Sequence, residues 1–208
     1  MTPATPEHAA KAVDRFVFFS DAVFAFALTL QAITLKLPSH DGKVPNAELT
    51  RALYDTLPAL ACYALSFVVV GLQWARHHRM FEKLRDYDTP VIALNFVLLF
   101  VISLFPLVIQ LVTSAEDVRV PYAIYGGLAG VLGVVALALW WHLQRTPGLL
   151  YEALTGVAFR RELIRQLSLP VAGFGMLVAF LALPREQGPY ALVALAIVLA
   201  VSRARRWQ

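Results

Sequence analysis

Six long stretches of this chain contain no charged residue, and each is rich in apolar side chains. They cover residues 22–35, 56–75, 89–115, 120–144, 166–184 and 187–202. A helix needs roughly 20 apolar residues to cross a bilayer, where backbone polar groups must be bonded within the segment. Of all residues, 59% are hydrophobic and only 15% are charged. The pattern predicts an all-α, polytopic membrane protein with six transmembrane helices in a single domain, residues 1–208.

Lys and Arg are unevenly distributed among the connections between these stretches. If the N-terminus is cytoplasmic, 13 of the 18 Lys and Arg residues fall on the cytoplasmic side. Because positive residues are retained on that side during insertion, both termini are expected in the cytoplasm. The same bias accounts for the net charge of +4, so nucleic acid is not an expected partner.

The first stretch is short, and polar residues precede it. Its uncharged run holds 14 residues, so Ser20 and Asp21 must lie below the bilayer surface if the helix is to span. A charged side chain there costs about 2.5 to 3.5 kcal/mol and indicates a functional site or a paired structural contact. The expected partners of Asp21 are Arg15, His77 or His78, and Asn95.

Large apolar residues of the first helix fall along one stripe. At about 100° per residue, Phe26, Leu30 and Ile33 lie close to one line, and Thr29 lies about 60° from Phe26. Asp21 lies about 140° from Phe26, so it is expected to face protein and not the stripe. The stripe itself fits two interpretations: contact with lipid or core, as for most apolar membrane residues, or the wall of a path.

Breakers and small residues set the expected limits of the helices. The first helix is expected over residues 13–37 and the second over 47–83. Pro106 removes a backbone hydrogen bond within the third stretch, so a kink is expected there. Gly126 and Gly130 have GxxxG spacing, which permits close packing either between copies or within one subunit. Residues 144–165 are expected to form a cytoplasmic connection with some amphipathic helix, and Gln31 to hydrogen-bond between helices.

The sequence does not contain the residue pattern of an enzyme. The adjacent His77 and His78 diverge by about 100° around a helix and cannot chelate a metal as an i, i+4 pair does. There is no HExxH, GxGxxG or P-loop, and no apolar stretch carries two carboxylates. The protein is therefore not expected to be an enzyme, nor to hold a cofactor or a fixed metal ion. Transport, conduction and a purely structural membrane role remain.

Three groups of residues together carry a family resemblance. The first is an RxxxFSD motif, formed by Arg15, Phe19, Ser20 and Asp21. The second is the run WARHHR over residues 74–79, and the third is ALNF over residues 93–96, followed by Pro106. In these features the chain resembles the transmembrane protein 175 family of potassium-permeable cation channels, specifically its short prokaryotic members with one six-span unit.

The resemblance implies a homotetramer in the plasma membrane of a prokaryote, with lipid, monovalent cations and further copies of the chain as partners. Four first helices would line a central path for potassium, without a TVGYG filter. Phe26 would form the main apolar constriction, Leu30 and Ile33 further rings, and Thr29 a hydroxyl layer that contacts potassium in transit. A polar network would hold the first helix in place, formed by Arg15, Phe19, Ser20, Asp21, His77, His78 and Asn95.

The sequence departs from the family pattern at the constriction, where Phe26 stands in place of the usual Ile or Leu. Four Phe rings would fill a narrow axis more completely, which implies a closed, poorly conducting resting state. Two other functions remain open. One is a proton channel, because Asp21, His77 and His78 lie near the inner surface, and the other is a non-conducting membrane scaffold or small-solute carrier.

Overall fold

The computed structural model describes residues 6–35, 45–115, 117 and 119–182. Its helices are α1 (Pro6–Ile33), α2 (Asn46–Phe81), α3 (Thr89–Ser103), α4 (Phe105–Ser114), α5 (Arg119–Arg145) and α6 (Gly156–Ala182). Among the described residues, five segments are long and apolar enough to cross a membrane, and α3 and α4 together form one of them. The all-α, multi-pass prediction is confirmed. The sixth expected span, residues 187–202, lies outside the described residues.

Two helices begin at other positions than expected. α1 begins at Pro6, before the expected residue 13, because the polar residues that follow Pro6 continue the helix beyond the apolar span. α6 begins at Gly156, so the second half of the expected connection 144–165 is continuous with a membrane helix. Within that half, Arg165 pairs with Glu162 at 3.1 Å, an i, i+3 contact that stabilises the polar turns.

Pro106 divides the third span into two helices. α3 and α4 are separated by Leu104, which forms a turn. Pro106 has no N–H to donate to the carbonyl of Ile102. The N–H of Leu107 donates to the carbonyl of Leu104 at 3.1 Å, whereas in a continuous helix it would donate to that of Ser103. The expected kink is therefore a break.

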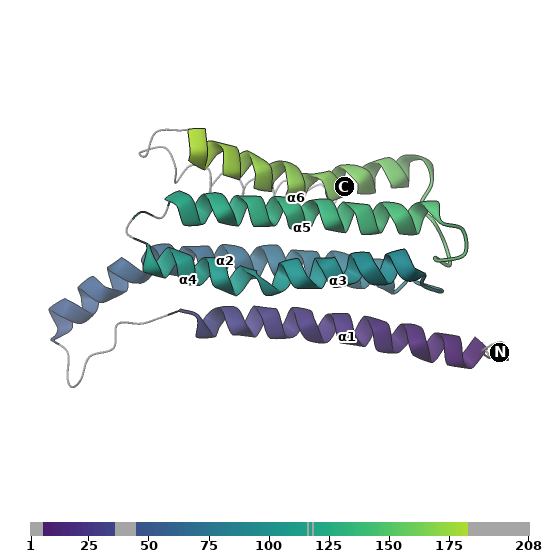
Figure 1. The fold of residues 1–208 in the computed structure, drawn as a ribbon, viewed down its shortest axis with the longest axis horizontal. Helices are drawn as coiled ribbons and strands as arrows, with labels where there is room; N and C mark the ends of the chain where they lie inside the picture. Colours follow the sequence, from purple (N-terminus) through teal and green to yellow (C-terminus); the bar gives the residue numbers. More distant parts are fainter. Residues whose placement is uncertain (1–5, 36–44, 116, 118, 183–208) are drawn as a thin grey trace.

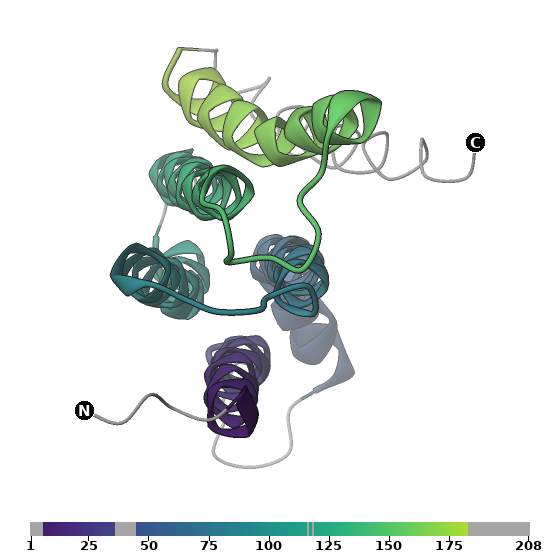
Figure 2. The ribbon, with the colours of Figure 1, turned by 90° about the vertical axis from the view of Figure 1, so that its right-hand side faces the viewer.

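The helices form a bundle with α1 on one side and α5 and α6 on the opposite side (Figures 1 and 2). α1 contacts α2, α3 and α4, whereas α6 packs mainly on α5. We call the end where α1 begins and α2 ends the basic end, because it carries Lys11, Arg79, Arg85, Arg145 and Arg160. Among the described residues, no helix covers the side of α1 that faces away from α2, α3 and α4.

Glycines allow α5 to pack directly on α6. A methyl group on Gly126 would lie 2.7 Å from the backbone nitrogen of Leu177, and one on Gly130 would lie 2.8 Å from the ring of Phe174. Gly173 of α6 in turn faces the backbone of Gly130. Of the two readings of the GxxxG spacing, the structure shows packing within one subunit.

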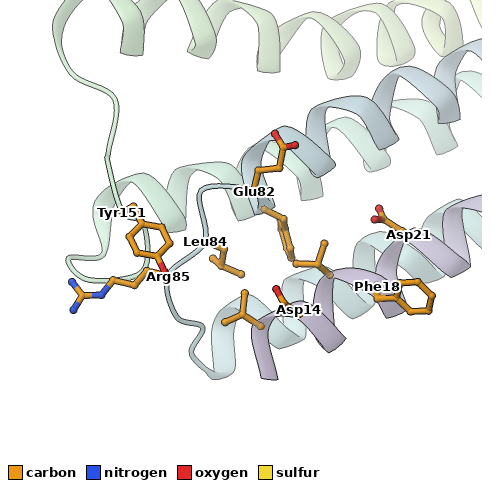
Figure 3. A pocket seen from close by; sticks show the side chains of 10 residues that line it. Asp14, Phe18, Asp21, Glu82, Leu84, Arg85 and Tyr151 are labelled. Carbon is orange, nitrogen blue, oxygen red and sulfur yellow. The ribbon is translucent and has the colours of Figure 1, made fainter. Parts of the chain in front are cut away.

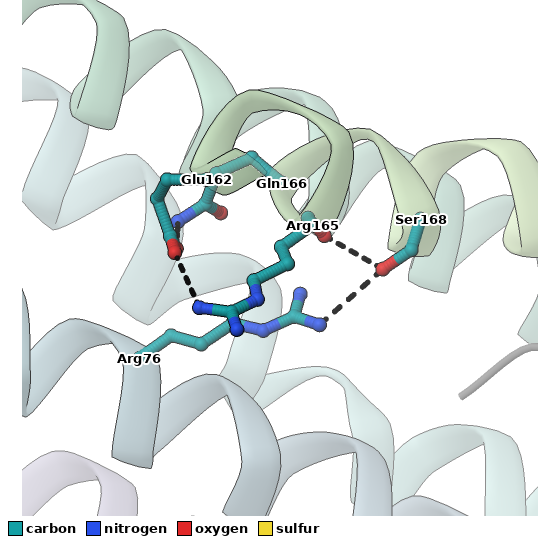
Figure 4. A network of polar contacts seen from close by, with 5 residues as sticks. All are labelled: Arg76, Glu162, Arg165, Gln166 and Ser168. Carbon is teal, nitrogen blue, oxygen red and sulfur yellow. Dashed lines mark hydrogen bonds and ion pairs between the residues drawn. The ribbon is translucent and has the colours of Figure 1, made fainter. Parts of the chain in front are cut away.

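A polar cluster joins α2 to the first half of α6 (Figure 4). The guanidinium of Arg76 donates to the hydroxyl of Ser168 at 3.3 Å, and that hydroxyl donates to the carbonyl of Arg165 at 2.6 Å. The amide of Gln166 donates to Glu162 at 3.2 Å. The Arg76–Ser168 bond joins α6 to α2, and the other two bonds lie within the charged turns of α6.

Asp88 joins α3 to α5 at the same end. Its carboxylate accepts a hydrogen bond from the Val91 N–H at 2.9 Å and so caps α3, and it lies 2.8 Å from Nε2 of His142. Partial burial alone would raise the pKa of Asp88, but the hydrogen bonds from Val91 and His142 lower it, and the net pKa lies below its ordinary value. The carboxylate form is thus favoured in the folded protein.

Candidate functional site

Ser20, Asn95 and His77 form a buried chain of hydrogen bonds between α1, α3 and α2. The side-chain N–H of Asn95 donates to the hydroxyl of Ser20 at 2.9 Å, and Oδ1 of Asn95 lies 2.8 Å from Nε2 of His77. The Ser20 hydroxyl donates to the carbonyl of Phe16 at 3.0 Å. Because an amide oxygen can only accept, His77 carries a proton on Nε2. The chain therefore runs in one direction, from His77 to the backbone of α1.

Apolar rings enclose this chain of hydrogen bonds. The ring of His77 stacks on Phe81 with centroids 3.9 Å apart and lies 5.3 Å from the ring of Phe24. Phe24 and Ser20 are both fully buried and four residues apart, so they share the face of α1 that packs on α2 and α3. In these apolar surroundings each hydrogen bond is stronger than in water, and each unpaired polar atom is more costly.

Asp21 contacts α2. Nε1 of Trp74 donates to its carboxylate at 2.8 Å, and Nδ1 of His78 lies 3.4 Å from the same group. The rings of Trp74 and His78 stack with centroids 5.3 Å apart. Arg15 is exposed, and within the described residues it forms no hydrogen bond or ion pair with Asp21. Of the expected partners, His78 contacts Asp21 directly, while Asn95 contacts Ser20 and His77 contacts Asn95.

Trp74 was not among the predicted partners of Asp21. A signal was present, because Trp74 and His78 are four residues apart and so lie on the same face of α2. Arg15 instead lines a shallow surface depression beside Phe18 and Phe19. Phe19 packs against α3, where its ring lies 5.7 Å from that of Phe96.

An open cavity of about 360 Å³ lies beside Asp21 near the basic end (Figure 3). Its charged lining comes from α1, from the end of α2 and from the segment that follows, and consists of Asp14, Asp21, Glu82 and Arg85. Three carboxylates against one guanidinium give the cavity a negative lining. Within the described part of the chain, no group of three or more His, Cys, Asp or Glu side chains is placed to hold a metal ion.

The side of α1 that faces away from the bundle carries large uncovered apolar residues. Phe26 is 67% exposed and Ile33 is 77% exposed, Thr29 is exposed between them, and Leu30 is half-buried on the flank. The hydroxyl of Thr29 donates to the carbonyl of Phe26 at 2.9 Å, so its oxygen can still accept. The open face of α1, as we call this surface, consists of Phe18, Ala22, Phe26, Thr29 and Ile33.

The structure thus separates the candidate residues into two groups on opposite sides of α1. The polar group faces α2 and α3: Ser20, His77 and Asn95 are buried, whereas Asp21 and His78 are partly exposed beside the cavity. The apolar group lies on the open face, with Thr29 among Phe26 and Ile33. A single helix therefore presents a fastened polar side and an uncovered apolar side.

Relatives of known description match most of this chain. A sequence model of the family described as endosomal/lysosomal potassium channel TMEM175 matches residues 15–106, from Arg15 of the motif to Pro106. A potassium channel of Streptomyces collinus is 32% identical over 183 residues, which are 85% of this chain and 87% of that protein. A potassium channel of Chamaesiphon minutus is 29% identical over 141 residues, 66% of this chain and 69% of that protein.

A solved structure shares the fold. The crystal structure of a lysosomal potassium-selective channel TMEM175 homolog from Chamaesiphon minutus matches with a TM-score of 0.74 at 23% sequence identity. The match covers 92% of this chain and 97% of that chain. From the near full-length similarity to the Streptomyces protein and the family match across the motif, the chain belongs to the TMEM175 family, a family of ion channels and not of enzymes.

Proposed function

We propose that this protein is a potassium-permeable cation channel in which four copies surround a path lined by α1. The observation that carries the proposal is the open face of α1, an uncovered apolar surface with one hydroxyl on a helix at the side of the bundle. An uncovered apolar surface on a membrane helix faces lipid, another copy of the chain or a lumen, and membership of a family of ion channels favours the lumen. The names of the relatives, which are potassium channels, support the same function.

In this assembly, rings of apolar side chains would close the path. Four copies of Phe26 form the main constriction, and Ile33 and the flanking Leu30 form further rings. An apolar constriction gates by dewetting, so opening must widen or hydrate these rings. Potassium, driven by its electrochemical gradient, would pass partly hydrated and contact the oxygen of Thr29, whose proton is engaged with the Phe26 carbonyl.

The polar residues on the other side of α1 would hold the helix against its own subunit. Ser20 is bonded to Asn95, and Asn95 to His77, while Asp21 is bonded to Trp74. The uneven distribution of Lys and Arg supports a basic end that faces the cytoplasm. Both termini would then lie on the cytoplasmic side of a prokaryotic plasma membrane. The negative lining of the cavity beside Asp21 would then attract cations at the inner mouth.

Cation flux into liposomes tests the pore assignment. Phe26→Ala removes the largest ring and should increase potassium flux severalfold, while Thr29→Ala should change the ratio of potassium to sodium flux. Phe100→Ala is the matched control, because Phe100 is a similarly exposed phenylalanine that belongs to α3 and not to α1. If Phe26→Ala and Thr29→Ala both leave flux and selectivity unchanged, the pore does not run along this face.

Proton conduction is a second candidate, and one contact favours it. His78 lies 3.4 Å from both Asp21 and Glu82, and the two carboxylates line the same cavity. A flux that follows a pH gradient and survives complete removal of potassium would support this candidate. A protein that is monomeric in mild detergent and passes neither ion would instead be a scaffold or a carrier.

A further inference from the structure

Gln31 of α1 is a fully buried polar residue whose side chain lacks a hydrogen bond. It is 0% exposed, and within the described part of the chain neither its amide oxygen nor its amide nitrogen has a hydrogen-bond partner. Buried amides are almost always hydrogen-bonded, and the hydrocarbon core of a membrane offers no bulk water to satisfy them. Gln31 therefore requires a partner that can both donate and accept.

The position of Gln31 relative to the polar chain indicates what it faces. Gln31 follows Ser20 by 11 residues, which is three helical turns with about 20° of residual rotation. It thus lies on the same face of α1 as Ser20, which contacts Asn95 of α3. Pro106 follows Asn95 by the same 11 residues, and α1 runs in the same direction as α3 and α4 (Figure 1). Gln31 is therefore level with Pro106.

The break between α3 and α4 supplies hydrogen-bond acceptors at this level. Pro106 offers no N–H to the carbonyl of Ile102, and the Leu107 N–H donates to Leu104 and not to Ser103. The carbonyl of Ser103 thus loses its usual donor within the helix, and that of Ile102 loses its own and faces only the Leu104 N–H, which is shared with Val101. α1 contacts α2, α3 and α4, so the buried face of α1 that carries Gln31 lies among these three helices, and α4 begins directly after the break.

We propose that a bound water molecule lies between the Gln31 side chain and the carbonyls of the α3–α4 break. The amide nitrogen of Gln31 can donate to a freed carbonyl, but its amide oxygen needs a donor that no carbonyl provides. A water molecule supplies two donors, one for this oxygen and one for the second carbonyl. Gln31 is then a positioning residue that fixes the far half of α1 behind Phe26 and Ile33.

A double-mutant cycle on thermal stability in detergent tests this site. Pro106→Ala restores an N–H that can bond to the carbonyl of Ile102. That carbonyl then no longer needs a hydrogen bond from Gln31 or its water. Gln31→Leu should lower the melting temperature of the parent protein by several degrees, and by much less in the Pro106→Ala background. Equal decreases in both backgrounds would overturn the proposal, because Gln31 and the break would then be independent.

Gln73→Leu is the matched control. Gln73 is also a buried glutamine with an unpaired amide oxygen among the described residues, but it lies on α2, one turn from His77. Its effect on the melting temperature should be the same in the parent protein and in the Pro106→Ala background. Coupling of Gln73 to Pro106 as strong as that of Gln31 would also contradict a local site.

A direct measurement covers the case in which a variant does not fold. In protein labelled with ¹⁵N-glutamine, the side-chain amide of Gln31, assigned by its loss in Gln31→Leu, should show magnetisation transfer from water. Absence of this transfer would overturn the proposal. Neither test depends on conduction. If the stability cycle shows the expected coupling while Phe26→Ala and Thr29→Ala leave cation flux unchanged, the α1 pore is contradicted and the water site is not.

Discussion

Asn95 is the side chain on which the polar chain depends, because it donates to Ser20 and accepts from His77. Asn95→Leu would leave Nε2 of the buried His77 without a partner and Ser20 with only its bond to the Phe16 carbonyl, and an unpaired buried polar group costs about 1 to 3 kcal/mol. Measured interhelical hydrogen bonds in membranes average about 0.6 kcal/mol, because the unfolded state also finds partners. We expect a total loss of about 1 to 3 kcal/mol, visible as a lower melting temperature in detergent.

The control for Asn95 lies two residues away. Val97 is exposed on α3, so Val97→Leu should leave the melting temperature unchanged. A stability of Asn95→Leu equal to that of the parent protein would mean that the chain of hydrogen bonds does not fasten α1. The family resemblance implied one network that includes Ser20, His77 and Asn95, whereas the cost of a charge in an apolar span predicted His77 and Asn95 only as possible partners of Asp21.

The two partners of Asp88 can be separated by substitution. Asp88→Ala removes the cap of α3 and should cost about 1 kcal/mol. Asp88→Asn keeps a capping oxygen and loses only the charge opposite His142, so it should cost less. Thermal denaturation at pH 7 would rank the parent protein, Asp88→Asn and Asp88→Ala in that order. Equal stabilities of all three would contradict a role of Asp88 at this helix end.

The lowered pKa of Asp88 also sets a pH dependence. Because the folded-state pKa lies below the ordinary value of about 3.9, the stabilisation is fully present above that value. It is lost as the pH falls through the lower folded pKa, where the carboxylate takes up a proton. We therefore compare the free energies of unfolding of the parent protein and Asp88→Asn. The part of their difference that arises from this carboxylate should persist from pH 7 to about pH 5 and decrease below about pH 4.

At the scale of elements, the contact between α5 and α6 depends on glycines, whose lack of a side chain lets the two backbones approach closely. A Cβ on Gly173 would meet the backbone of Gly130, which cannot move aside as a flexible side chain can, whereas a Cβ on Gly175 would meet nothing within 4 Å. Gly173→Ala should therefore destabilise the protein by about 1 to 3 kcal/mol, as overpacking does. Gly175→Ala should be neutral or slightly stabilising, since alanine favours helix. Melting temperatures that do not differ between the two variants would contradict this packing.

Helices were more predictable than their ends. The long uncharged runs predicted the spans, because only an internally bonded helix suits an apolar segment of that length. The charged turns of α6 gave no such signal, since their helix is stabilised by side-chain pairs such as Arg165 with Glu162 and by the contact of Arg76 with Ser168. Pro106 predicted a kink, but whether the helix bends or breaks depended on the hydrogen bonds that its neighbours form.

At the scale of the whole molecule, the side position of α1 in the bundle leads to a prediction about assembly. The chain has one cysteine, Cys62, so a Cys62→Ser background allows a single probe. If four α1 helices surround one axis, cysteines placed by Phe26→Cys should converge and form disulfide-linked dimers under mild oxidation. Native mass spectrometry should show four copies.

The control for cross-linking is Phe100→Cys, on an exposed position of α3. It should give little dimer under the same conditions. Cross-linking as efficient at position 100 as at position 26, or a mass other than four copies, would contradict the proposed assembly.

By itself, the sequence determined the class of fold, the number of membrane spans within the described residues and the residues of the polar motif. It did so because charge and polarity in a bilayer are costly, so their positions are restricted by local rules. The tertiary structure decided which partner each polar group has: Asp21 contacts Trp74 and His78, and Arg15 remains outside. It also placed Thr29 on the open face of α1 and Leu30 on its flank, because packing against neighbouring helices sets the rotation of a helix.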